Sequence, residues 1–159
     1  MIQMIVVGAL KESYLREGQQ YFLDEISKRE DVELIELEDE KVPETASEKE
    51  LTMIRQIEGQ KILSKVNRLN TMIAMDIDGK SMTKDKWSNL FEQHRTQKKG
   101  MTFIIGGSVG LSDEVKQRAN FRVSFSRLTF PHQLFRLMLL EQIAMEYLCS
   151  SPHISDFFL

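Results

Sequence analysis

Residues 103–112 read FIIGGSVGLS, and this stretch decides the fold class. The apolar run 101–105 is typical of a buried strand. Glycines at 106, 107 and 110 allow the main chain to turn sharply and a ligand to approach it closely, and Ser112 is a residue type that caps helices. The order strand, glycine turn and helix indicates an α/β protein, in which ligands bind at the carboxyl ends of strands.

The glycine turn alone is equally consistent with a plain strand-to-helix connection. It lacks the Gly-Lys-Ser/Thr ending of a phosphate loop, and Gly106-Gly107 does not reproduce GxGxxG. A nucleoside triphosphate or a dinucleotide is therefore disfavoured as the ligand.

Outward from this stretch, apolar runs and helical periodicities alternate along the chain. We expect strands at 2–7, 32–37, 71–75, 101–105 and 121–125. We expect helices at 12–28, 47–66, 84–96 and 131–148, and a short helix opened by Ser112. Ser47 and Glu50 form a capping box for the second helix, and Pro131 suits the first turn of the last one. This alternation predicts a three-layer α/β/α fold with a mostly parallel sheet. The last helix is apolar on nearly every face from Leu134 to Leu148, which predicts a homodimer through it.

Composition narrows the class of protein. A chain of 159 residues suits one domain, residues 1–159, and 42% apolar with 28% charged residues is ordinary for a globular protein. The single Cys149 suits a reducing compartment, and no signal peptide or membrane span is evident, so we expect a cytoplasmic protein without membrane partners. The net charge of −3 makes it unfavourable for this protein to bind DNA or loose RNA mainly by neutralising phosphates.

Short motifs follow one another in a fixed order along the chain. They are Val7-Gly8, Asp39-Glu40-Lys41 before Pro43, Glu58-Gly59 with Ile62-Leu63, residues 103–108, Gly110-Leu111-Ser112, Ser124-Phe125-Ser126, residues 128–133 and Leu140-Glu141-Gln142. In order and spacing this set resembles the RlmH family of ribosomal RNA large subunit methyltransferases over about residues 1–143. No single motif is decisive, and the ordered set carries the resemblance.

The resemblance implies a SPOUT-class homodimer with a trefoil knot. It also implies S-adenosylmethionine as cofactor, bound in this chain by Met75, Gly106, Phe125, Ser126, Arg127, Leu128, Thr129 and Phe130. For the apolar members of that set, ordinary core packing is about as good an explanation as adenine contact. The resemblance further implies methylation of N3 of a pseudouridine in large-subunit ribosomal RNA on the assembled ribosome, so the ribosome and its RNA are the implied partners.

Methyl transfer needs an aligned nucleophile and a group that takes the ring-nitrogen proton. His132 matches a family histidine, although a first-turn histidine is more often structural. His94, beside Arg95, could touch phosphate or simply end a solvated helix, and Arg127 could face cofactor or RNA or be an exposed structural residue. His153 in the tail is our candidate catalytic residue, because it has a suitable unperturbed pKa.

The C-terminus departs from the family pattern. Where the family has Tyr-Arg-Ala, this chain has Ala144, Met145 and Glu146, and its tail keeps Pro152 and His153 without the tyrosine between them. We therefore predict persistent cofactor binding with slow or absent methyl transfer. The alternative function is a catalytically weakened homologue that binds the cofactor or a ribosomal partner without turnover. A third candidate function is a flavodoxin-like nucleotide-binding module, which is supported only by the alternation of strands and helices.

Overall fold

The computed structural model describes residues 1–148. They divide into two compact units. The first contains residues 1–9 and 33–129, and the second contains residues 10–32 and the segment from Phe130 onward. The candidate cofactor residues lie in the first unit, except Phe130.

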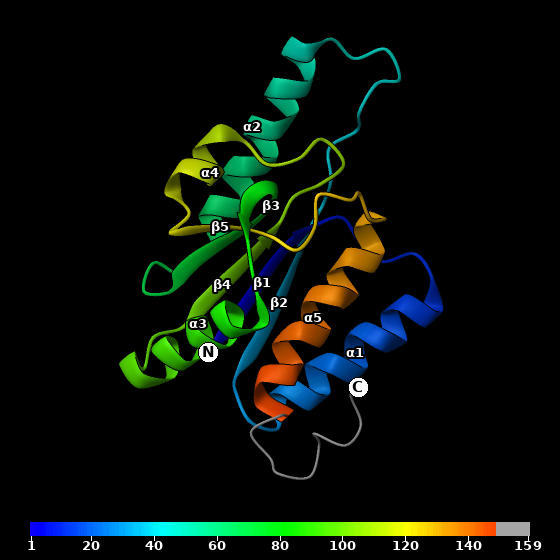
Figure 1. Cartoon of the computed structure of the whole chain (residues 1–159). Coiled ribbons are helices and arrows are strands. Elements are labelled where there is room, and N and C mark those ends of the chain that lie inside the picture. Colours follow the sequence, from blue (N-terminus) through cyan, green and yellow to red (C-terminus); the bar gives the residue numbers. More distant parts are fainter. Residues whose placement is uncertain (149–159) are drawn as a thin grey trace. The chain divides into compact units, whose positions relative to one another are not determined.

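The first unit is built on a five-stranded sheet in the order β2-β1-β4-β3-β5 (Figure 1). The strands are β1 (Ile2–Val7), β2 (Val32–Leu37), β3 (Thr71–Ser81), β4 (Met101–Ile105) and β5 (Phe121–Ser124). The pairings β1–β4, β3–β4 and β3–β5 are parallel. All six residues of β1 and all five of β4 are buried, as predicted for interior strands.

Helices cover both faces of this sheet, as the alternation of elements predicts. On one face, Ile62 of α2 (Glu48–Lys65) and Val115 of α4 (Asp113–Arg118) share a buried cluster with Ile104. On the other face, α3 (Lys84–Gln97) packs Trp87 and Phe91 on Phe103, with ring centroids 5.8 and 6.0 Å apart. The two faces alternate along β4 because successive side chains of a strand point to opposite sides. The three-layer prediction is confirmed within this unit.

Local signals explain where these helices begin. The hydroxyl of Ser47 accepts the backbone N–H of Glu50 at 3.2 Å and donates to the Glu50 carboxylate at 3.2 Å, so Ser47 caps α2 as predicted. Ser112 accepts the N–H of Val115 at 3.3 Å in α4. These caps satisfy N–H groups that a helix cannot pair internally.

β3 is longer than the predicted strand 71–75, because its chain continues in extended form to Ser81. Its pairing with β5 shifts between Met75 and Lys80, which are both level with Val123, so residues 76–79 form an irregularity within the strand rather than its end. At Gly79 a Cβ would lie 2.6 Å from the backbone carbon of Arg122, and only glycine tolerates that approach. The break expected at Asp76 and Gly79 is therefore a shift of register within β3.

The second unit pairs α1 (Ser13–Ser27) with α5 (His132–Leu148). A Cβ at Gly18 would lie 2.8 Å from Leu137, so the two helices approach closely there. The fully buried Arg136 donates to Gln19 at 3.2 Å, and Arg29 donates to the carbonyl of Tyr147 at 3.0 Å. Within residues 1–148, no helix is long and apolar enough to cross a membrane.

Candidate cofactor edge of the sheet

Three neighbouring strands end at one edge of the sheet. Ala74 is level with Ile104, and Met75 is level with Val123. The carboxyl ends of β4, of the regular part of β3 and of β5 are therefore adjacent. Met75 is 8% exposed there, and the loops that follow β4 and β5 begin at Gly106 and Phe125. This is where ligands bind in open α/β sheets.

The loop after β4 is a tight glycine turn. The N–H of Gly110 donates to the carbonyl of Gly107 at 3.0 Å, and Gly110 has a φ of +82°, which favours glycine. A Cβ at Gly106 would lie 2.8 Å from the side chain of Leu111 and 3.1 Å from the backbone carbon of Gly110. The space that a Gly106 side chain would occupy is thus filled by the loop itself. The turn therefore requires glycine at this position even without a ligand.

The loop after β5 is held by short-range contacts. The hydroxyl of Ser124 donates to the carbonyl of Ser126 at 3.1 Å, and the hydroxyl of Ser126 accepts the N–H of Leu128 at 3.0 Å. Phe125 packs its ring edge on Trp87, with centroids 5.4 Å apart. The side chain of Leu128 is nevertheless 70% exposed. An ordered loop thus presents an apolar side chain to its surroundings beside the strand ends.

A buried carboxylate locks β3 to β5 at the same edge. Asp76 accepts two hydrogen bonds from Arg122, from Nε at 2.9 Å and from Nη2 at 2.6 Å, and one from the N–H of Asp78 at 3.1 Å. Lys116 lies 3.9 Å from the same carboxylate. Burial raises the pKa of Asp76, but the hydrogen bonds and the two cations outweigh it, and the net pKa lies below 3.8. Asp76 is therefore an ion-pair anchor and not a proton acceptor at neutral pH.

Comparison with known proteins identifies the family. Residues 1–147 match the family model described as "Predicted SPOUT methyltransferase". The chain is 47% identical over 147 residues to "Ribosomal RNA large subunit methyltransferase H" of Clostridioides difficile (strain 630), with 92% of each chain covered. Proteins of the same name from Streptococcus pneumoniae (strain CGSP14) and Clostridium botulinum (strain Loch Maree / Type A3) are 50% identical over 145 residues and 45% over 155. The alignments cover 89% and 96% of this chain, and 90% and 98% of those relatives.

This chain belongs to the RlmH family of SPOUT methyltransferases.

A solved "probable methylase family protein from Haemophilus influenzae Rd KW20" superposes with a TM-score of 0.49 and 8% identity, over 96% of this chain and 69% of that one. That similarity is too weak to support any conclusion about fold. The fold of this RlmH family member rests on its own parallel sheet and covering helices.

The other predicted residues of this RlmH family member are dispersed. Arg127 and Thr129 are exposed on the loop after β5, whereas Phe130 begins the second unit. His153 lies outside the described residues. His132 is the first residue of α5. His94 does not end a solvated helix: it is 7% exposed, and Nδ1 lies 2.5 Å from the carbonyl of Leu90.

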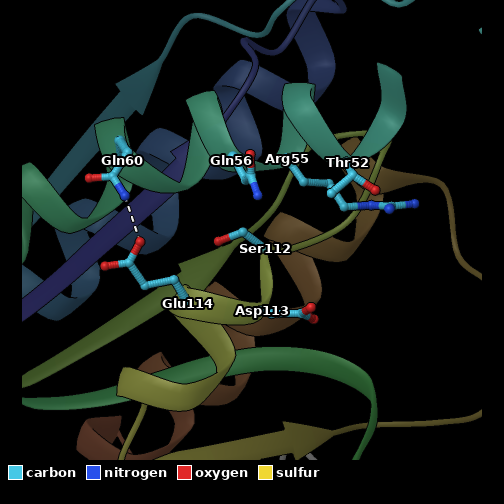
Figure 2. A pocket seen from close by; sticks show the side chains of 7 residues that line it. All are labelled: Thr52, Arg55, Gln56, Gln60, Ser112, Asp113 and Glu114. Atoms are coloured by element: carbon cyan, nitrogen blue, oxygen red, sulfur yellow. Dashed lines mark hydrogen bonds between the residues drawn. The ribbon is translucent and has the colours of Figure 1, made fainter. Parts of the chain in front are cut away.

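A polar pocket of about 370 Å³ lies between α2 and α4 (Figure 2). It is lined by Thr52, Arg55, Gln56, Gln60, Ser112, Asp113 and Glu114. Arg55 is engaged by the carbonyl of Val109 at 2.6 Å and by Glu48 at 3.1 Å, and Gln60 donates to Glu114 at 2.5 Å. With one cation already bonded and two carboxylates in the lining, this pocket is a poor site for phosphate.

Two carboxylates, those of Asp76 and Glu58, are buried although the sequence pattern did not predict it. Asp76 appeared as the end of a strand, and Glu58 as part of a helix motif, because the residues that contact them are remote in the chain. An acidic residue within an apolar stretch was the available signal, since carboxylates are rarely buried unless they are paired. Among residues 1–148, no group of three or more His, Cys, Asp or Glu side chains is arranged to hold a metal.

Proposed function

We propose that this RlmH family member uses S-adenosylmethionine to methylate N3 of a pseudouridine in large-subunit ribosomal RNA. The observation that carries the proposal is the 47% identity to a ribosomal RNA large subunit methyltransferase H, with 92% of both chains covered. One family model spans residues 1–147, which supports our proposal of a single SPOUT-like domain.

We propose that the cofactor lies against Met75, Gly106 and residues 125–129 of the loop after β5. The first unit supports this choice, because three strand ends meet there and the ordered loop exposes the apolar Leu128. A site for a small ligand is mostly apolar with a few placed polar groups, and this end of the sheet offers the apolar side chains of Met75 and Leu128. The residues present therefore fit the group.

When bound, S-adenosylmethionine supplies a methyl group on a positively charged sulfur. The protein would have to hold the acceptor ring in line with that methyl group and accept the N3 proton, since the new N–C bond forms as the methyl–sulfur bond breaks and leaves a neutral thioether. Asp76 is unsuited to accept it, because Arg122 and Lys116 stabilise its ionised form and keep its pKa low. Our candidate base remains His153, whose place lies beyond the described part of the chain.

We further propose a cytoplasmic homodimer with the trefoil knot of the SPOUT class, acting on the ribosome. The net charge of −3 supports a substrate read as an assembled particle rather than as loose RNA. On α5, Leu134 remains 43% exposed, which supports a role in dimer contact.

The second candidate is a weakened homologue that binds the cofactor or a ribosomal partner without turnover. It is favoured by Met145 at the position of the family arginine, because an apolar side chain there cannot hold phosphate.

The deciding experiment supplies S-adenosylmethionine carrying a labelled methyl group to ribosomes that lack the pseudouridine methyl mark. Methylation of large-subunit RNA at N3 supports the enzyme. Calorimetric cofactor binding without transfer selects the weakened homologue. Absence of both would refute the cofactor site and the activity together.

A further inference from the structure

Glu58 of α2 is a buried acid at the base of the glycine loop. Glu58 is 3% exposed, and its carboxyl oxygen Oε2 accepts the backbone N–H of Glu40 at 3.0 Å. Its Oε1 is also buried and receives no hydrogen bond from the described residues. A buried carboxyl oxygen without a hydrogen bond lowers the stability of the folded protein, and the cost is larger when the group is ionised. Such an atom in a folded protein therefore calls for a functional explanation.

Glu58 lies directly against Gly107. A Cβ at Gly107 would lie 3.0 Å from Oε1 of Glu58 and 3.0 Å from Cγ1 of Val7. Gly107 opens the turn that Gly110 closes by donating to its carbonyl at 3.0 Å. The carboxyl group therefore packs on the first residue of that turn, next to Gly106.

The same face of α2 holds the loop at two further points. Nε of Arg55 donates to the carbonyl of Val109 at 2.6 Å. Gly59 packs so closely on the Ser112 side chain that a Cβ there would clash with its hydroxyl oxygen. Positions 55, 58 and 59 lie on one face because they are three to four residues apart on a helix. The loop is thus clamped along its length by one helix, with Glu58 at the end nearest the strand.

We propose that Glu58 is a positioning residue: its side chain ties the Gly106–Gly110 loop to the backbone at Glu40, and so sets the affinity of the cofactor site. This inference rests on the proposed function for its ligand. The mechanical part, the fixing of the loop, stands on the contacts of Glu58 itself.

Burial, and after it the neighbouring carboxylates, shift Glu58 toward its neutral form. Burial raises its pKa above the ordinary 4.5, the N–H of Glu40 opposes this, the charges of Asp39 and Glu40 raise it further, and Lys61 lowers it. Lys61 is already held by Glu40, at 2.5 Å. The residues that pack nearby from the glycine loop and from β1 are Gly107 and Val7, and neither carries a charged side chain. As pH rises through the raised pKa, an unpaired buried charge forms beside Gly107, and the loop is destabilised.

The test compares Glu58→Gln, Glu58→Ala and the control Glu44→Gln, which removes the same charge from an exposed position. S-adenosylmethionine affinity is measured by calorimetry from acidic to alkaline pH. Wild type and Glu44→Gln should bind more weakly as pH rises, whereas Glu58→Gln, which keeps the shape of the neutral acid, should show a flat profile. Glu58→Ala should bind roughly fivefold more weakly at acidic pH, the effect of one buried hydrogen bond.

Hydrogen–deuterium exchange supplies a readout that does not need the ligand. Glu58→Ala should speed exchange at residues 106–111 and leave β4 protected, and Glu58→Gln should restore the wild-type rate. Unchanged exchange in Glu58→Ala, or a pH profile of Glu58→Gln equal to that of wild type, would overturn the proposal. Wild-type protein that binds no S-adenosylmethionine but shows the exchange effect would refute the proposed function and the affinity role, while the loop contact would stand.

Discussion

Arg122 donates two hydrogen bonds to a single carboxylate oxygen of Asp76, at 2.9 and 2.6 Å, from a strand 46 positions further along the chain. The Asp76 side chain is 4% exposed and that of Arg122 is 42% exposed. The pair joins β5 to β3 where the register of their pairing shifts. It therefore stabilises the edge at which the candidate cofactor loops begin.

Removing the arginine should leave the buried carboxylate without its main partner. We expect Arg122→Ala to lower the free energy of unfolding by roughly 1–3 kcal/mol. Because the folded pKa of Asp76 lies below 3.8, its contribution is fully present above pH 3.8 and is lost as pH falls through the folded value. The variant should therefore unfold at a higher pH than wild type in acid titration.

Urea unfolding and acid titration followed by circular dichroism measure both effects. The control is Arg118→Ala, which removes a solvent-exposed pair with Glu114 at 3.6 Å and should change stability by less than about 1 kcal/mol. Equal effects of the two variants would show that the Asp76 pair does not stabilise this edge.

The exposed Leu128 offers the cleanest probe of the cofactor site. Leu128→Ala should weaken S-adenosylmethionine binding roughly tenfold, because the ligand would lose apolar cover. Its stability should change by less than about 0.5 kcal/mol, since the side chain is 70% exposed without ligand. Calorimetry and thermal unfolding measure the two quantities.

Leu69→Ala is the matched control, because Leu69 is 81% exposed and precedes β3 at the opposite end of the strand. It should bind cofactor like wild type. Gly106→Val is a weaker probe, because its side chain would collide with Leu111 and unsettle the loop even without a ligand. Wild-type affinity in Leu128→Ala would remove that residue from the site.

The proposed dimer predicts different outcomes for two leucines of α5. Leu134 is 43% exposed, so Leu134→Glu should keep the fold and dissociate the dimer. Leu140 is fully buried within its own chain, so Leu140→Glu should unfold the protein by burying an unpaired charge. Sizing chromatography and circular dichroism separate dissociation from unfolding. A wild-type monomer at micromolar concentration would end the dimer proposal.

The altered C-terminus predicts cofactor binding without efficient transfer. Met145 is partly exposed, so Met145→Arg can place a cation for RNA without disturbing the core. It should raise methyl transfer to unmethylated ribosomes roughly tenfold or more, most strongly when a family-type tail is also supplied. Ala144 is 1% exposed, so Ala144→Tyr would overpack α5 and belongs in a separate variant.

Each variant is assayed at fixed salt, with calorimetric cofactor binding as the control for an intact site. Wild-type turnover equal to that of Met145→Arg with the family tail would show that the family arginine and tail are dispensable here.

By itself, the sequence determined the order of strands and helices, the serine caps of α2 and α4, and the family. These depend on patterns within a few residues, such as the apolar run of β4 and the pairing of Ser47 with Glu50, or on ordered motifs that can be compared directly. The edge carrying Met75, Gly106 and Phe125 was also predictable, since parallel strands bring their carboxyl ends together.

Only the tertiary structure decided which polar groups meet. Asp76 finds Arg122, Glu58 packs on Gly107, and His94 is buried at the end of a helix that seemed solvated. The atoms that fill the space above Gly106 also come from the folded loop. Such contacts join residues that no local periodicity connects. Whether a carboxyl group is ionised or neutral depends on the burial and the neighbouring charges that folding creates.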